Sequence, residues 1–148
     1  MNAANQAIKA YAQINMETAV NCANPVQLIV ALYDGAVDAI AGAKAQIAQK
    51  NYERKAKHIS HAILIIDGLR RIIDHEKGGA IAANLGALYD YMKRRLIAAN
   101  ASNAVEVLAE VQELLTSLRE AWAVLARSQA GVPTDAPPAQ GAKAYAKA

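Results

Sequence analysis

The side chains best suited to metal chemistry lie along one predicted helix and at its end. His58 and His61 are three positions apart, and Asp74, His75 and Glu76 follow one another directly. A di-iron site in a helical bundle needs inward carboxylates and a Glu-x-x-His motif on two helices, and the sequence contains no Glu-x-x-His. The predicted interior positions are Ile, Leu and Ala. We therefore interpret the histidines as surface residues and expect neither a metal nor another cofactor.

Catalytic groups are equally sparse. The sequence has no glycine-rich phosphate loop and no nucleophile elbow. Cys22 and His75 could form a dyad only if the fold brought them together, and Asp34 and Asp38 are better explained as solvated residues or as partners of arginines. Cys22 is the only cysteine, which rules out an internal disulfide and fits a reducing compartment. The sequence does not predict an enzyme.

The basic residues do not form a nucleic-acid-binding pattern. Arg70-Arg71 and Lys93-Arg94-Arg95 are separated by acidic residues, and the net charge is only +3. Arg95 borders an apolar stripe, so we expect it to pair with an acidic residue of a neighbouring helix. The first residues do not resemble a signal peptide, and no apolar run approaches the roughly 18 residues of a membrane span. These features predict a cytoplasmic protein that neither binds nucleic acid nor inserts into a membrane.

Helix signals divide the chain into four elements. The 148 residues are 54% hydrophobic but include no Phe, which favours an aliphatic helical core. Asn24-Pro25 predicts the start of a helix that ends near Lys50, and a second helix is expected over about 52–74. Gly78-Gly79 predicts a break before a third helix over about 80–99. Ser102 or Asn103 can cap a fourth, which ends near Arg127.

Helices of this length joined by short turns predict an all-α fold, an antiparallel four-helix bundle. The expected domain covers residues 1–127, and residues 1–20 form a mobile or loosely docked N-terminal arm. The Pro- and Ala-rich residues 128–148 are expected to form a flexible tail. Within the third helix, Leu85, Leu88, Met92 and Leu96 recur at helical spacing and are predicted to lie in the core.

Several apolar residues fall outside the single stripe that a bundle helix needs. Such extra stripes indicate a fully buried helix, an oligomer, or a groove for a partner, and periodicity alone leaves these alternatives open. Ile8 and Tyr11, three positions apart in the arm, could fill such a groove. The candidate partner-binding residues are Ile8, Tyr11, Tyr33, Ile65, Ile72, Leu108 and Leu115.

Four stretches, in the same order and spacing, give the chain a family resemblance. It resembles the flagellar secretion chaperone FliS family, and LYDYMKRRL is the most specific part of the match. Residues 128–148 match nothing in the family. The matching stretches are AYAQINMETA (10–19), NPVQLIVALYDGA (24–36), EKGGAIAANLGALYDYMKRRLIAAN (76–100) and EVQELLTSLREAW (110–122).

The resemblance implies a function as well as a fold. Family members bind the C-terminal segment of flagellin, which is disordered in the free monomer, prevent premature polymerisation in the cytoplasm, and present the subunit to the export gate protein FlhA. The family's N-terminal tyrosine motif matches Tyr11, which implies that the arm covers a groove until the client arrives. The alternative is a regulatory or adaptor bundle that self-associates through the same stripes.

Overall fold

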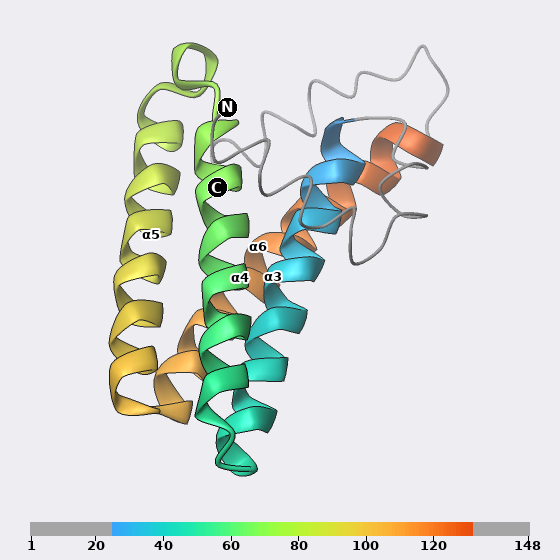
Figure 1. The fold of residues 1–148 in the computed structure, drawn as a ribbon. Helices are drawn as coiled ribbons and strands as arrows, with labels where there is room; N and C mark the ends of the chain where they lie inside the picture. The colour runs from blue at the N-terminus through green and yellow to red at the C-terminus, as the bar shows by residue number, and fades with distance from the viewer. Residues whose placement is uncertain (1–24, 132–148) are drawn as a thin grey trace.

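The computed structural model describes residues 25–131, the last three by their backbone alone. Within this range the chain forms four helices and no strand: α3 (Pro25–Ala48), α4 (Tyr52–Arg71), α5 (His75–Ser102) and α6 (Val105–Gly131). They pack as an antiparallel bundle, in which the pair α4 and α5 crosses the tilted pair α3 and α6 (Figure 1). The all-α bundle is therefore confirmed. The arm over 1–20, with Ile8 and Tyr11, and the tail from 132 lie outside the described residues.

Side-chain caps fix the starts of two helices. The Asn51 side chain accepts a hydrogen bond of 3.2 Å from the backbone N–H of Arg54 at the start of α4. The Asp74 side chain accepts one of 3.0 Å from the N–H of Lys77 at the start of α5. Each cap satisfies an N–H group that has no partner within its own helix.

The predicted position of the turn between the second and third helices is wrong, but the predicted break at Gly78-Gly79 is confirmed. The second helix ends at Arg71, and the chain reverses through Ile72 to Asp74, which caps the first turn of α5. At Gly79 the backbone is not helical, with φ 53° and ψ −127°, and α5 consists of two helical segments that meet there at a kink. Only glycine adopts this conformation without strain.

The predicted cap of the last helix is also wrong. Ser102 still belongs to α5, where its hydroxyl donates to the carbonyl of Ala98. Asn103 ends α5 in a left-handed conformation, and the carbonyl of Ala104 accepts the first hydrogen bonds of α6, from Val107 and Leu108. Helix α6 continues to Gly131, past the predicted end near Arg127.

The core is aliphatic, as the absence of Phe requires, and two buried tyrosines join it. Met92 and Leu96 are fully buried as predicted, whereas Leu85 and Leu88 are only partly buried. Helix α3 is, by length and composition alone, apolar enough to cross a membrane. This corrects the expectation that no stretch of the sequence is long and apolar enough to do so. A core helix of a soluble protein meets the same criterion, and buried residues of α3 from Ala31 to Ala43 belong to this core.

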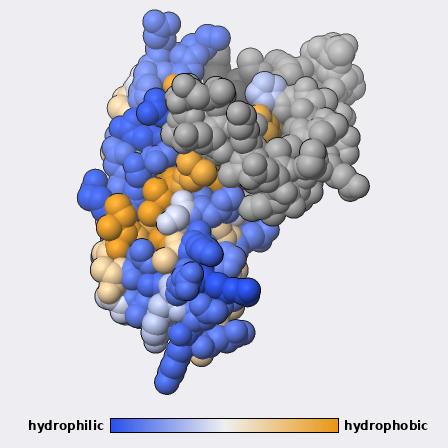
Figure 2. Space-filling model, in the orientation of Figure 1, coloured by the Kyte–Doolittle hydropathy of each residue, from blue (hydrophilic) through white to orange (hydrophobic). Residues whose placement is uncertain are grey.

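The face seen in Figure 2 is mostly hydrophilic, with an apolar patch over α4 and α5. Ion pairs join the helices. Arg95 of α5 lies 2.8 Å from Glu110 of α6, which confirms its predicted structural pairing. Asp34 of α3 pairs with Arg119 of α6, which agrees with its interpretation as an arginine partner.

Candidate partner-binding pocket

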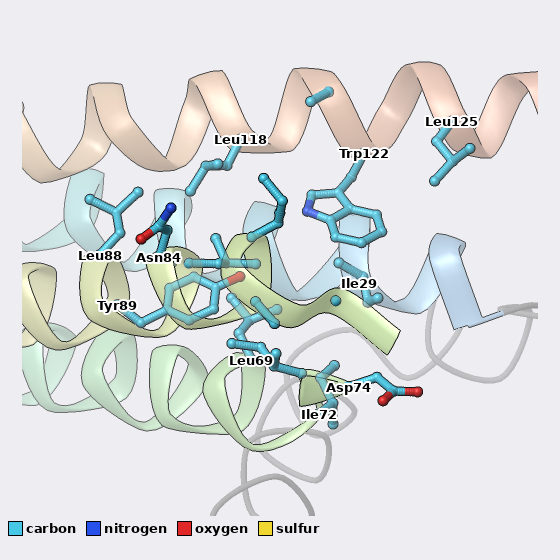
Figure 3. A pocket seen from close by; sticks show the side chains of 16 residues that line it. Ile29, Leu69, Ile72, Asp74, Asn84, Leu88, Tyr89, Leu118, Trp122 and Leu125 are labelled. Carbon is cyan, nitrogen blue, oxygen red and sulfur yellow. The ribbon is translucent and has the colours of Figure 1, made fainter. Parts of the chain in front are cut away.

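An apolar pocket of about 580 Å³ opens at one end of the bundle. All four helices and the α4–α5 turn contribute to its wall. Figure 3 shows side chains from α6 on one side, with Trp122 and Leu118, facing Tyr89 and Leu88 of α5 on the other. The sixteen lining residues are Ile29, Leu69, Ile72, Ile73, Asp74, Gly78, Ile81, Ala82, Asn84, Leu85, Leu88, Tyr89, Leu118, Ala121, Trp122 and Leu125.

The pocket exists because α5 and α6 diverge. Two residues, Asn103 and Ala104, join them, so the end of α5 and the start of α6 lie close together. Towards its other end α6 follows the tilted α3 and moves away from the first half of α5 (Figure 1). Apolar residues there lack a facing helix: Ile72 is 40% exposed and Ile81 is 38% exposed. Apolar surface left uncovered in this way is typical of a binding site.

A hydrogen-bonded pair of tyrosines lies at the inner wall of the pocket. Tyr33 of α3 is fully buried, and its hydroxyl is hydrogen-bonded to that of Tyr89 of α5. Burial raises the pKa of Tyr33 to about 12 and also raises the pKa of Tyr89 strongly. An interaction with the Trp122 side chain opposes part of this rise at Tyr33. Both phenols therefore stay protonated at neutral pH and act as donors.

Ion pairs hold α4 against α5 beside the pocket. Arg70 donates two hydrogen bonds to the Asp90 carboxylate, of 2.7 and 2.9 Å. Lys93 lies 2.5 Å from Asp67. The hydrogen bond from Arg70 lowers the pKa of Asp90. The two pairs run in opposite senses between the helices, so together they fix the register of α5 on α4.

A second polar cluster joins α5 to α6 towards the closed end of the bundle. Glu110 accepts hydrogen bonds from the Tyr91 hydroxyl, at 2.5 Å, and from Arg95, at 2.8 Å. These bonds, that from Tyr91 foremost, lower the pKa of Glu110. Tyr91 is thereby engaged in joining two helices, which explains why it does not line the pocket whereas Tyr89 does.

The structure divides the predicted site residues. Ile72 lines the pocket. Of the three alternatives for the extra stripes, burial holds for four residues, which lie in the core: Tyr33, Ile65, Leu108 and Leu115. That they bind a partner stays a prediction. They are buried because the helices pack over wider faces than one stripe. Ile65 in particular cannot take part in the predicted self-association surface.

The sequence predicts that Leu85 and Leu88 lie in the core, yet both residues line the pocket. Leu85, Leu88 and Leu118 continue the same stripes as buried residues further along their helices. Periodicity identifies the face of a helix that is apolar, but it does not tell how far the neighbouring helix covers that face. A sequence signal was present at Ile81, which extends the α5 stripe beyond the residues needed for a short bundle.

The part of the chain that the structure describes holds no group of three or more His, Cys, Asp or Glu residues able to bind a metal ion. The pocket wall contributes one carboxylate, Asp74, and that group already caps α5. The wall is thus suited to an apolar partner and carries no constellation of acid, base and nucleophile.

Comparison with known proteins gives the chain its family. The family model described as flagellar protein FliS matches residues 7–129. The flagellar secretion chaperone FliS of Salmonella typhimurium is 49% identical over 116 residues, which cover 78% of this chain and 86% of that protein. The flagellar secretion chaperone FliSB of Pseudomonas aeruginosa is 40% identical over 117 residues, covering 79% and 93%. That of Bacillus subtilis is 37% identical over 106 residues, covering 72% and 78%.

The match includes all four helices and the pocket between them. The described chain is a four-helix bundle with an open apolar end, and most of its length matches the family of secretion chaperones. This chain belongs to the flagellar protein FliS family of flagellar secretion chaperones.

Proposed function

We propose that this chain is a cytoplasmic export chaperone for flagellin. It binds the C-terminal segment of the newly made subunit, prevents premature polymerisation, and delivers the subunit to the export gate protein FlhA. The observation that carries the proposal is the apolar pocket of about 580 Å³ in a chain of the secretion chaperone family.

The chemistry of the pocket suits a disordered client. A segment that folds on binding loses conformational entropy, and burial of apolar surface is the main term that offsets this loss. The pocket supplies Leu and Ile side chains and one Trp, an aromatic residue typical of energetically important contacts. The apolar patch on α4 and α5 (Figure 2) offers further surface along which a long segment can continue.

The N-terminal arm is proposed to cover the pocket before the client arrives. Residue Ile29, in the second turn of α3, lines the pocket, so the described chain begins beside it. Tyr11 stands 14 positions before Pro25, and a chain of that length reaches up to roughly 45–50 Å. Ile8 and Tyr11 can therefore reach any part of the pocket wall. Their release on client binding would make them available to FlhA.

The test is a binding measurement with purified proteins. The full chain should form a one-to-one complex with flagellin, measured by calorimetry and light scattering, and deletion of the C-terminal segment of flagellin should abolish it. FlhA should bind the complex more tightly than it binds the free chaperone. Equal binding of full-length and truncated flagellin would refute the proposal. A stable dimer of the isolated chain, with no flagellin binding, would instead favour the self-associating alternative.

A further inference from the structure

The tyrosine pair in the pocket wall has more donors than its own oxygens can use. Tyr33 and Tyr89 each bring one O–H, and their hydroxyls are hydrogen-bonded to each other. Only one of the two protons can lie between the two oxygens. The indole of Trp122, whose side chain interacts with Tyr33, can only donate, so it offers no acceptor. Among the described residues, no acceptor remains for the second hydroxyl proton.

The position of the spare proton depends on which tyrosine donates to the other. If Tyr89 donates, Tyr33 keeps an unpaired O–H at a site with 0% exposure. A buried donor without an acceptor is costly. If Tyr33 donates, the spare O–H belongs to Tyr89, which lines the pocket. The second arrangement is favoured because the proton then points to a space where an acceptor can enter.

The surroundings of this proton are apolar. Figure 3 shows the Tyr89 hydroxyl directed to the side of the pocket where Trp122 and Ile29 lie, and the indole nitrogen faces the same space. The polar side chains of the wall, Asp74 and Asn84, come from the α4–α5 turn and from α5 itself. In such surroundings a single donor is a strong determinant of what binds, because a hydrogen bond is worth more where water is excluded.

We propose that the Tyr89 hydroxyl is the polar specificity contact of the pocket and donates to a carbonyl oxygen of the bound client segment. The proposal rests on the proposed function, in which that segment is the C-terminal part of flagellin. The client thus fills the pocket with apolar side chains and places one carbonyl, from its backbone or from an Asn or Gln, against Tyr89. Tyr33 is a positioning residue: it uses its own proton to orient the oxygen of Tyr89.

The test compares two variants that each lose one hydroxyl of the pair. Tyr89→Phe removes the donor to the client, whereas Tyr33→Phe leaves that donor in place and removes only its orienting partner. Binding of the C-terminal segment of flagellin to the full chain is measured by calorimetry. One neutral hydrogen bond corresponds to about a five- to tenfold change in Kd. We expect that loss for Tyr89→Phe and a loss at least about threefold smaller for Tyr33→Phe.

A measurement on the unmodified chain complements the variants. With tyrosines labelled with ¹³C at Cζ, the Tyr89 signal should shift when the segment binds, since Cζ responds to the hydrogen bond made by its own hydroxyl. A smaller shift is expected for Tyr33. This spectrum decides the question even if a variant fails to fold.

The outcomes separate the two proposals. If the unmodified chain does not bind the flagellin segment, the proposed function is refuted and the role of Tyr89 with it. If it binds but Tyr89→Phe binds as tightly, or both variants lose affinity equally, only the specificity contact is refuted. Selective loss in Tyr89→Phe, with a matching Tyr89 shift, supports it.

Discussion

Replacement of Ile72 by Asp should weaken client binding strongly and leave the bundle folded. Of the predicted partner-binding residues that the structure describes, Ile72 alone lines the pocket, and it is 40% exposed. Ile72 follows the last helical residue of α4, and the substitution keeps the backbone N–H with which this residue caps the helix. The substitution introduces a carboxylate into surface that a client would have to cover.

The magnitude follows from the exposed fraction. Complete burial of an Ile side chain is worth about 1.5–3 kcal/mol, so covering the exposed two-fifths contributes about 1 kcal/mol to binding. The carboxylate of Ile72→Asp must in addition lose part of its hydration without a partner. Together these terms amount to about 2–3 kcal/mol, or roughly a 30- to 150-fold increase in Kd for the flagellin segment. Ile72→Ala should lose only the first term, about a fivefold change.

Val124→Asp is the matched control. Val124 lies on α6 near the same end of the bundle and is 43% exposed, but it does not line the pocket. Calorimetry with the C-terminal segment of flagellin measures Kd for all three variants, and thermal unfolding shows whether each is folded. If Val124→Asp weakens binding as much as Ile72→Asp, the effect is one of charge and the pocket is not the client site. If neither variant changes Kd, the pocket does not contact this segment.

Three further predictions concern the fold. Leu115→Ala should lower the free energy of unfolding by about 2–5 kcal/mol, because Leu115 is fully buried; an unchanged unfolding curve in denaturant would mean that it is not a core residue. Gly79→Ala should cost about 1–3 kcal/mol through the backbone alone, since φ is +53° and an added Cβ would meet no atom within 4 Å; an unchanged melting temperature would contradict the kink. Because the hydrogen bond from Arg70 lowers the pKa of Asp90 below 3.8, the pair stabilises the fold above about pH 4 and this contribution is lost as the pH falls through the lowered pKa. Because both side chains of the pair are exposed to solvent, the loss is small, and Asp90→Asn, compared by thermal melts from pH 7 to pH 3, should remove that part of the acid sensitivity.

The helices themselves could be predicted because their signals are local. Asn24-Pro25 indicated the start of α3, and the apolar spacing of Met92 and Leu96 indicated the buried face of α5. The glycine pair indicated the break at Gly79, where two helical segments of α5 meet at a kink. The reversal between α4 and α5 was harder to predict, because Asp74 caps a helical turn four residues before Gly78. The sequence does not show which of two neighbouring signals marks the reversal.

Contacts between helices could be predicted from the sequence only where the chemistry of a side chain restricts its partner. A basic residue at the edge of an apolar stripe must find an acid, and Arg95 finds Glu110. Apolar residues carry no such restriction. Ile65 of α4 and Ile72, which directly follows this helix, are seven positions apart and share one helical phase, yet Ile65 is fully buried and Ile72 is 40% exposed. Their difference comes from the crossing of the helices, which is a property of the whole bundle.

The same reasoning explains why core and binding site use one set of residues. At the closed end, a two-residue turn joins α5 to α6, and the buried Lys55 donates to the carbonyl of Asn100, which ties α4 to α5. Stripe residues near that end, such as Leu96, are fully buried. At the other end no connection holds α5 to α6, so Leu85 and Leu88 face the pocket although they belong to the same stripe. A sequence that closed the pocket would need only larger side chains or a less tilted α6. The open end is therefore the feature on which binding depends, and filling it, for example with Ala82→Phe on its wall, should exclude the client while the closed end keeps the bundle folded.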